Sequence, residues 1–260
     1  MKKIDLPQKL VETSGLIYFN GLVWTFNDSG GESEIYSYSM ISNKIEHKVN
    51  LWNTNNYDWE EISQDSTHIY IGDFGNNFGT RKYMYIYKID KKDITYNRKN
   101  SLATAKAIRF TYPDYHRVLF SMKIRSAFDC EAMIWHDGSI YIFTKNWVNQ
   151  TSTIYRLPDN PGHYLAEKIG EFDSKGLITA ASYHHGCLYL LGYYNYTPFL
   201  WIFPHTSNFA LNTKNGVRYD LKPLQGEQTE GIAVIDSSTV LISAEKTKDY
   251  PHLFVIKLTR

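Results

Sequence analysis

Three glutamates and two hydroxyl residues occupy the same position of a short motif that recurs along the chain. They are Ser14, Glu60, Glu131, Thr179 and Glu230, at intervals of 46, 71, 48 and 51 residues. Calcium takes roughly six to eight oxygen ligands at about 2.3–2.6 Å, so five converging oxygens with water would suit it. Without a cation, carboxylates crowded into a narrow space must raise their pKa values. We therefore predict Ca²⁺, with Mg²⁺ as second choice. The alternative, that these groups bond only to backbone and water, stays open.

Short strands must position these residues, because the apolar residues of the chain alternate with polar ones or are β-branched in brief runs. The clearest runs are 68–72, 83–89, 139–143, 187–191, 240–243 and 252–258. Turn pairs such as Asn20-Gly21 and Asp137-Gly138 separate neighbouring runs. No long segment has helical periodicity between two caps. The sequence therefore predicts an all-β protein.

The repeated motif divides the chain into units of about fifty residues, a length typical of a β-propeller blade. We predict a single domain, residues 1–260, that forms a five-bladed β-propeller with four-stranded antiparallel blades. A strand around residues 3–6 would complete the last blade and remove its open edge. The interval of 71 residues is too short for two blades. It indicates an insertion near residues 113–127, and a degenerate sixth blade is the alternative.

In a propeller, the ends of the second strands lie on the same face as the starts of the innermost strands. Among the residues at these ends, Asp28 and Asp73 could orient a water molecule and Lys145 could bind an anionic group. Aromatic and charged side chains at the same ends could bind a ligand; these candidates are Trp147, Tyr193, Glu245 and Lys246. For any aromatic residue on this face, Trp59 included, the alternative is packing between blades.

Four segments carry a resemblance to a known family: Glu12 to Gly21, Asn27-Asp-Ser-Gly30, Asp73-Phe-Gly75 and Thr229-Glu-Gly-Ile232. They are similar to segments of the calcium-activated nucleotidases, or apyrases, which are five-bladed propellers. That family holds a central Ca²⁺ with Ser, Glu, Glu, Ser and Glu in chain order. The resemblance therefore implies the ligands Ser14, Glu60, Glu131, Thr179 and Glu230, with one Ser-to-Thr change.

One departure from the apyrases concerns their chemistry. Their loop has an arginine where this chain has Ser29, so a charge that would neutralise phosphate is missing. The whole chain is more closely similar to a group of uncharacterised, mostly secreted bacterial propeller proteins. That second likeness names no activity.

The composition limits the partners that we expect. The 28 Lys+Arg nearly cancel the 27 Asp+Glu, which argues against a nucleic-acid partner. No apolar stretch is long enough for a membrane-spanning helix, and Asp5 and Pro7 interrupt the run that a signal peptide would need. Cys130 and Cys187 have no zinc-site spacing. We expect a monomer that does not insert into membranes. The compartment stays open, although the resemblance suggests secretion.

Two functions remain open at this point. We favour a binding module whose polar and aromatic face takes a small ligand, a glycan or a peptide, because no nucleophile or acid/base pair is evident. The alternative is a Ca²⁺-dependent hydrolase of nucleotides or other phosphate esters, in which the ion polarises the substrate or activates water. Whether the protein is an enzyme is left open.

Overall fold

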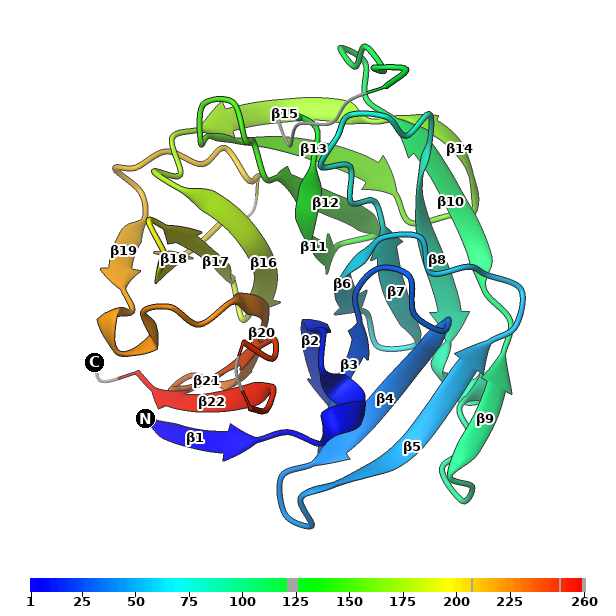
Figure 1. The fold of residues 1–260 in the computed structure, drawn as a ribbon. Helices are drawn as coiled ribbons and strands as arrows, with labels where there is room; N and C mark the ends of the chain where they lie inside the picture. Colours follow the sequence, from blue (N-terminus) through cyan, green and yellow to red (C-terminus); the bar gives the residue numbers. More distant parts are fainter. Residues whose placement is uncertain (121–125, 207, 248, 259–260) are drawn as a thin grey trace.

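The computed structural model describes residues 1–120, 126–206, 208–247 and 249–258. Their strands form five sheets arranged as blades around a central axis (Figure 1). Helical structure in these ranges is limited to three short 3-10 turns, Gln8–Leu10, Lys91–Asp93 and Lys222–Leu224. None of the described helices has the length and apolar character needed to cross a membrane. The predicted all-β, five-bladed propeller is confirmed.

Each blade has four main strands, ordered from the axis outward. Blade 1 contains β2 (Thr13–Phe19), β3 (Leu22–Asn27), β4 (Glu34–Ser39) and β5 (Lys44–Leu51). Blade 2 contains β6 (Trp59–Gln64), β7 (His68–Asp73), β8 (Met84–Asp90) and β10 (Lys106–Thr111). Blade 3 contains β11 (Cys130–His136), β12 (Ser139–Thr144), β13 (Ser152–Pro158) and β15 (Glu167–Phe172). Blade 4 contains β16 (Leu177–His184), β17 (Cys187–Tyr194), β18 (Thr197–Phe203) and β19 (Val217–Asp220). Blade 5 contains β20 (Thr229–Asp236), β21 (Thr239–Ala244), β22 (His252–Lys257) and β1 (Lys2–Asp5).

The N-terminal strand closes the ring as the sequence predicted. β1 pairs antiparallel with β22, with Ile4 opposite Leu253, and the two strands lie side by side in Figure 1. Because the outer strand of blade 5 comes from the other end of the chain, separating the ends requires breaking a complete ladder of hydrogen bonds.

The long interval between motifs belongs to one blade, and its extra residues lie in two places. One part, residues 91–105, includes β9 (Asn100–Ala103), which pairs in parallel with β5 of blade 1. The other part connects β10 to β11 and overlaps the predicted insertion near 113–127, of which residues 121–125 lie outside the described ranges. β14 (Gly162–Leu165) likewise leaves blade 3 to pair in parallel with β10 of blade 2. A strand that pairs with the neighbouring blade thus joins blades 1 and 2, and another joins blades 2 and 3.

The hydrophobic core consists of five clusters, each lying between two neighbouring blades. Trp59 belongs to the cluster between blades 1 and 2, where it is completely buried and meets the ring of Phe26 edge-on at 5.5 Å. Edge-to-face pairs of this kind add to the free energy gained by burial. Trp59 therefore packs between blades and offers no surface to a ligand.

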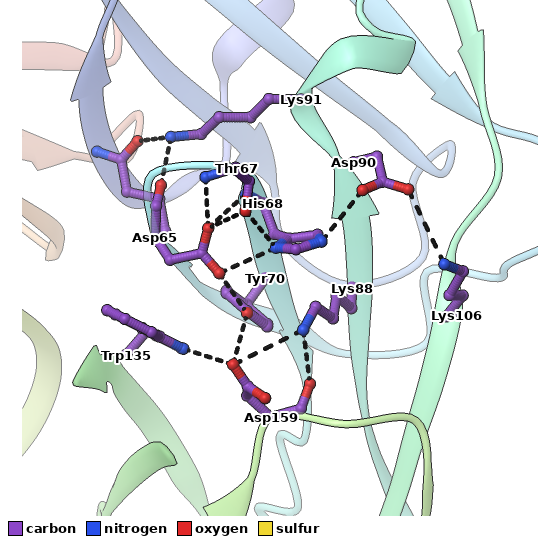
Figure 2. Close-up of polar contacts among 11 residues, drawn as sticks. Asp65, Thr67, His68, Tyr70, Lys88, Asp90, Lys91, Lys106, Trp135 and Asp159 are labelled. Carbon is purple, nitrogen blue, oxygen red and sulfur yellow. Dashed lines mark hydrogen bonds and ion pairs between the residues drawn. The ribbon is translucent and has the colours of Figure 1, made fainter. Parts of the chain in front are cut away.

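A polar network on the edges of blades 2 and 3 connects these blades (Figure 2). Asp65, in the turn between β6 and β7, accepts hydrogen bonds from the backbone N–H of His68 at 2.6 Å and from the hydroxyl of Tyr70 at 2.7 Å. The same hydroxyl lies 3.1 Å from Asp159 of blade 3, which also accepts a bond from the indole N–H of Trp135 at 2.8 Å. Asp65 is thus the main hydrogen-bond acceptor on the blade 2 side of this network.

We expect Asp65→Asn to lower the free energy of unfolding by about 2 kcal/mol at neutral pH, because an amide cannot accept on both of its terminal atoms. Burial alone would raise the pKa of Asp65, but hydrogen bonds from Tyr70, Thr67 and His68 outweigh it and hold the pKa well below its ordinary value. A carboxyl with a lowered pKa stabilises the fold above its unfolded pKa of about 3.9, and this contribution disappears as the pH falls through the folded pKa. Urea denaturation at pH 7 and pH 3 should therefore show a smaller difference between wild type and variant at pH 3. An unchanged difference would contradict this role of the charge.

Candidate functional site

Every innermost strand breaks register with its neighbour at the repeated motif. The breaks fall between Trp59 and Glu61, between Cys130 and Ala132, between Ile178 and Ala180, and between Thr229 and Gly231. The residue left unpaired is the middle residue of each motif: Glu60, Glu131, Thr179 and Glu230. In blade 1 the break follows Ser14. A β-bulge re-aims the side chain of its extra residue, and the bulged glutamates Glu60, Glu131 and Glu230 all line the axial cavity.

A cavity of about 480 Å³ lies at the axial end where the innermost strands begin, and we call it the axial cavity. It contains most of the site residues that the sequence predicted: Ser14, Asp28, Glu60, Glu131, Lys145, Trp147, Tyr193, Glu230 and Glu245. Asn77, Tyr196 and Glu227 also line it. Three predicted residues, Asp73, Thr179 and Lys246, do not. Lys246 is exposed and lines a neighbouring groove near the N-terminal strand.

The two hydroxyl residues of the motif connect neighbouring blades. The Ser14 Oγ donates a hydrogen bond to the carbonyl of Glu60 at 2.8 Å, and the Thr179 Oγ1 donates to the carbonyl of Thr229 at the same distance. Each hydroxyl proton is therefore used between two innermost strands. For Ser14 and Thr179, these contacts agree with the alternative prediction that the motif residues bond to the backbone.

Glu131 is paired with a cation from its own blade. Lys145, which follows β12, places its Nζ 2.6 Å from Glu131 Oε1, and both side chains are almost fully buried. The ammonium also lies 4.9 Å from the ring centre of Trp147 and 5.3 Å from that of Tyr193. Burial alone would lower the pKa of Lys145, but the neighbouring Glu131 and Glu230 raise it well above its usual range. The charge that the sequence offered to an anionic ligand is therefore already neutralised by Glu131.

Glu60 faces two aspartates. One carboxylate oxygen each of Asp28, Asp58 and Glu60 lie within 4.8 Å of one another, and we call these residues the acidic trio. Glu60 is only 5% exposed, and no hydrogen bond to its carboxylate is found among the described residues. Asp58 was not selected from the sequence, although it stands two residues before Glu60 in the motif.

The backbone at Gly75 makes room for the acidic trio. A Cβ atom at this position would lie 2.3 Å from Asp58 Oδ2 and 2.3 Å from Glu60 Oε1. Only glycine leaves the two carboxylates their present space, and Gly75 does not need a positive φ to do so. The sequence signal was the Gly-Asp-Phe-Gly segment at the end of β7.

Acids of the axial cavity and of the acidic trio hold their protons more tightly than ordinary carboxyls. Burial is the main cause, and neighbouring negative charges add to it. The pKa rises to about 6 for Asp28, to about 7 for Asp58 and Glu230, and to about 9 for Glu245. The pKa values of Glu60 and Glu131 also lie well above their usual range, for the same first reason. Such shifts mark buried carboxyls that are crowded together.

Asp73 and Asp129 orient the residues around the cavity. Asp73 is fully buried, forms an ion pair with Arg81 at 2.8 Å and accepts the backbone N–H of Asp58 at 3.2 Å. Asp129 accepts the indole N–H of Trp147 at 2.7 Å. Asp73 therefore reaches the acidic trio through the backbone, and the prediction that it orients a water molecule gains no support from its position.

A second buried carboxylate, that of Glu61, connects blades 2 and 4. Glu61 is completely buried and accepts hydrogen bonds from the N–H of Ile62 at 2.9 Å and, across the axis, from the N–H of Ala181 at 2.8 Å. The backbone N–H groups of Leu16 and Met133 also act on it. Ile62 and Ala181 line the cavity at the opposite mouth, whereas Glu60 lines the axial cavity. Sequence reasoning missed Glu61.

The structure offers a different set of oxygen ligands for the Ca²⁺ that the family resemblance implies. The five motif residues do not converge as one ligand set, because Glu131 holds Lys145 and Thr179 lies outside the cavity lining. The acidic trio fits a hard cation better: it offers only oxygen atoms, contains the buried carboxylate of Glu60, and lies in a space that a Cβ at Gly75 would fill. Ca²⁺ binding by the motif residues stays a prediction, and the trio is the better donor set.

Comparisons with known proteins concern the fold. No protein-family model matches the sequence, and no curated protein matches it. Among solved structures, a glucose dehydrogenase is similar with a TM-score of 0.57 at 7% identity, with both chains covered over 100% of their length. The soluble aldose sugar dehydrogenase of Escherichia coli has a TM-score of 0.56 at 7% identity, with 99% of each chain covered. A hypothetical protein from Leishmania major has a TM-score of 0.53 at 12% identity, covering 99% of this chain and 90% of the other.

Likeness at these identities extends to the fold alone. The matches do not single out the calcium-activated nucleotidases. Together with the five sheets and the closing strand, they identify the chain as a five-bladed β-propeller with an acidic cavity on its axis.

Proposed function

We propose that the protein binds a small ligand, a glycan or a peptide in the axial cavity, and that the acidic trio holds a divalent cation there. Ca²⁺ is preferred to Mg²⁺, because three carboxylates on two blades supply an irregular ligand set that the flexible coordination of Ca²⁺ accepts. The observation that carries the proposal is Glu60, a carboxylate 5% exposed that faces two further acids without a partner among the described residues.

The rest of the cavity supports binding of a ligand. Trp147, Tyr193 and Tyr196 contribute rings to its lining, and Tyr196 is 81% exposed at the mouth. Rings with a polar atom at one end suit a site that is apolar on one side and wet on the other. A bound cation would orient an oxygen-rich ligand and offset part of the surrounding negative charge.

Hydrolysis of phosphate esters ranks second. Among the described residues, six carboxylates and one cation, Lys145, line the cavity, and that cation is bound to Glu131. Phosphoryl transfer depends on positive groups around the transferring phosphate. We expect no phosphate release from nucleoside di- and triphosphates in the presence of Ca²⁺. Steady release that is lost in Asp58→Asn would reverse this ranking.

Removal of the cation should lower the melting temperature. A ligand at one hundred times its Kd stabilises the native state by about 2.7 kcal/mol, which is about 5–10 °C for a chain of this size. We expect the chelated protein to regain this shift with millimolar Ca²⁺ and to regain less of it with Mg²⁺. Equal melting curves in chelator and in Ca²⁺ would refute the cation site.

Two variants make the test specific. Asp58→Asn should lose the Ca²⁺ shift, yet melt no lower than wild type in chelator, because it removes one of three repelling charges. Gly75→Ala should also lose the shift, since its Cβ would displace two of the carboxylates. Gly170→Ala is the matched control, because a Cβ at Gly170 meets nothing within 4 Å, and it should keep the shift. A full Ca²⁺ shift in Asp58→Asn would contradict the assignment.

A further inference from the structure

We infer that the part of the axial cavity formed by blades 4 and 5 takes the ammonium group of a small organic cation, held by Glu230 and Glu245 beneath the ring of Tyr196. This inference rests on the proposed function, because it names the chemical class of the ligand that the same cavity binds.

The charge of the cavity selects against anions. Its lining contains the carboxyl groups of Asp28, Glu60, Glu131, Glu227, Glu230 and Glu245. Lys145 is the one cationic side chain in this lining, among the described residues. A divalent cation on the acidic trio and the ammonium of Lys145 together carry three positive charges, and Glu227 pairs with Lys3 at 3.3 Å. Glu230 and Glu245 are then left without a counter-ion among the described residues. A positively charged ligand group would be attracted to the remaining acids, and a phosphate or carboxylate would be repelled.

The cavity already holds one ammonium group in this manner. The Nζ of Lys145 lies against both oxygens of Glu131 and faces the rings of Trp147 and Tyr193. Carboxylate and aromatic faces together are a common way for proteins to hold a desolvated ammonium group. The chain thus shows, with its own side chain, the recognition that we assign to the ligand.

Blades 4 and 5 repeat these elements without an ion pair of their own. Glu230 is 7% exposed, and its carboxylate feels the charge of Lys145, which is bound to Glu131, and the side chain of Gln228. Glu245 follows β21, and its backbone N–H is fixed to the carbonyl of Gln228 at 2.9 Å. No ion pair among the described residues includes either glutamate.

An aromatic ring is placed at the mouth beside these acids. The carbonyl of Tyr196 accepts the backbone N–H of Gly226 at 2.8 Å, which ties the loop between β17 and β18 to the segment that leads into β20. Tyr196, Gln228 and Glu230 line the same cavity. Tyr196 therefore lines the same cavity as the two acids, and its exposed ring could cover the apolar chain of an alkylammonium ligand.

The test uses 1,4-diaminobutane as the cationic probe and 1,4-butanediol as its neutral counterpart, measured by calorimetry on the Ca²⁺-loaded protein. We expect the diamine to bind and the diol not to bind. Glu245→Gln should weaken diamine binding by about tenfold or more, because one partner of a desolvated charge pair is lost. Tyr196→Ala should weaken it less. Glu32→Gln, which changes an exposed glutamate outside the cavity, should leave it unchanged.

The outcomes separate this inference from the cation site. Three results would overturn the ammonium site: no diamine binding, equal binding of the diol, or diamine binding that Glu245→Gln leaves unchanged. The Ca²⁺ melting shift of the same samples reports on the acidic trio alone. Displacement of the diamine by Ca²⁺ also overturns it, because the two sites would then be one. Diamine binding that survives in a protein without a Ca²⁺ shift supports the ammonium site and removes the proposed divalent cation.

Discussion

Glu61→Ala should lower the free energy of unfolding by about 3–5 kcal/mol, one of the two largest effects that we expect from a single substitution. The carboxylate accepts N–H groups from two different blades at 2.9 and 2.8 Å in a fully buried position. Each buried N–H left without an acceptor costs about 1–3 kcal/mol, and the deleted side chain also leaves a cavity at the axis. Urea denaturation followed by tryptophan fluorescence would measure the loss.

The adjacent residue supplies the control. Glu60 is also a buried glutamate of β6, but it faces other carboxylates and has no hydrogen-bond donor among the described residues. Glu60→Gln in chelator should therefore be neutral or stabilising, because it removes charge repulsion at nearly constant volume. If Glu61→Ala and Glu60→Gln destabilised the protein equally, Glu61 would have no special role as a connection between blades.

The contrast between these neighbours also defines what the sequence can predict. The recurring motif predicted the number of blades and most of the motif residues that line the axial cavity, because both depend on a pattern repeated five times. The closing strand followed from the length of chain left at the two ends. Strand alternation then predicts that only one of Glu60 and Glu61 faces the channel. The bulge between Trp59 and Glu61 breaks this alternation, so both side chains reach the axis with opposite surroundings. Nothing in their residue type separates the two roles.

For a related reason, contacts between residues distant in the chain could not be predicted from the sequence. Asp58 became recognisable only once Asp28 and Gly75 were placed against it from other strands. Lys145 was correctly located near the axis, but its charge was assigned to a ligand because the bond to Glu131 depends on side-chain direction. The parallel strands β9 and β14 are short and cross to a neighbouring blade, so the repeat pattern of their own blades carries no sign of them.

Lys145→Met should destabilise the fold by about 3–5 kcal/mol, because it leaves the buried carboxylate of Glu131 without its cation. Methionine has a similar volume, so the loss reports on charge more than on packing. The double variant Lys145→Met/Glu131→Gln should recover about 1–3 kcal/mol of this loss, as expected for two groups in direct contact. If the losses of unfolding free energy in the two single variants simply added in the double variant, the Lys145–Glu131 ion pair would not stabilise the fold.

Calcium should change the outcome of the same substitution. Lys145→Met removes the one cationic side chain found in the described lining of the axial cavity, so the remaining carboxylates attract a divalent cation more strongly. We expect the melting shift produced by Ca²⁺ to be larger in Lys145→Met than in wild type, and to return toward the wild-type value in the double variant. A smaller shift in Lys145→Met would mean that the lysine helps to build the cation site, because its loss would then disturb Asp28, Asp58 or Glu60.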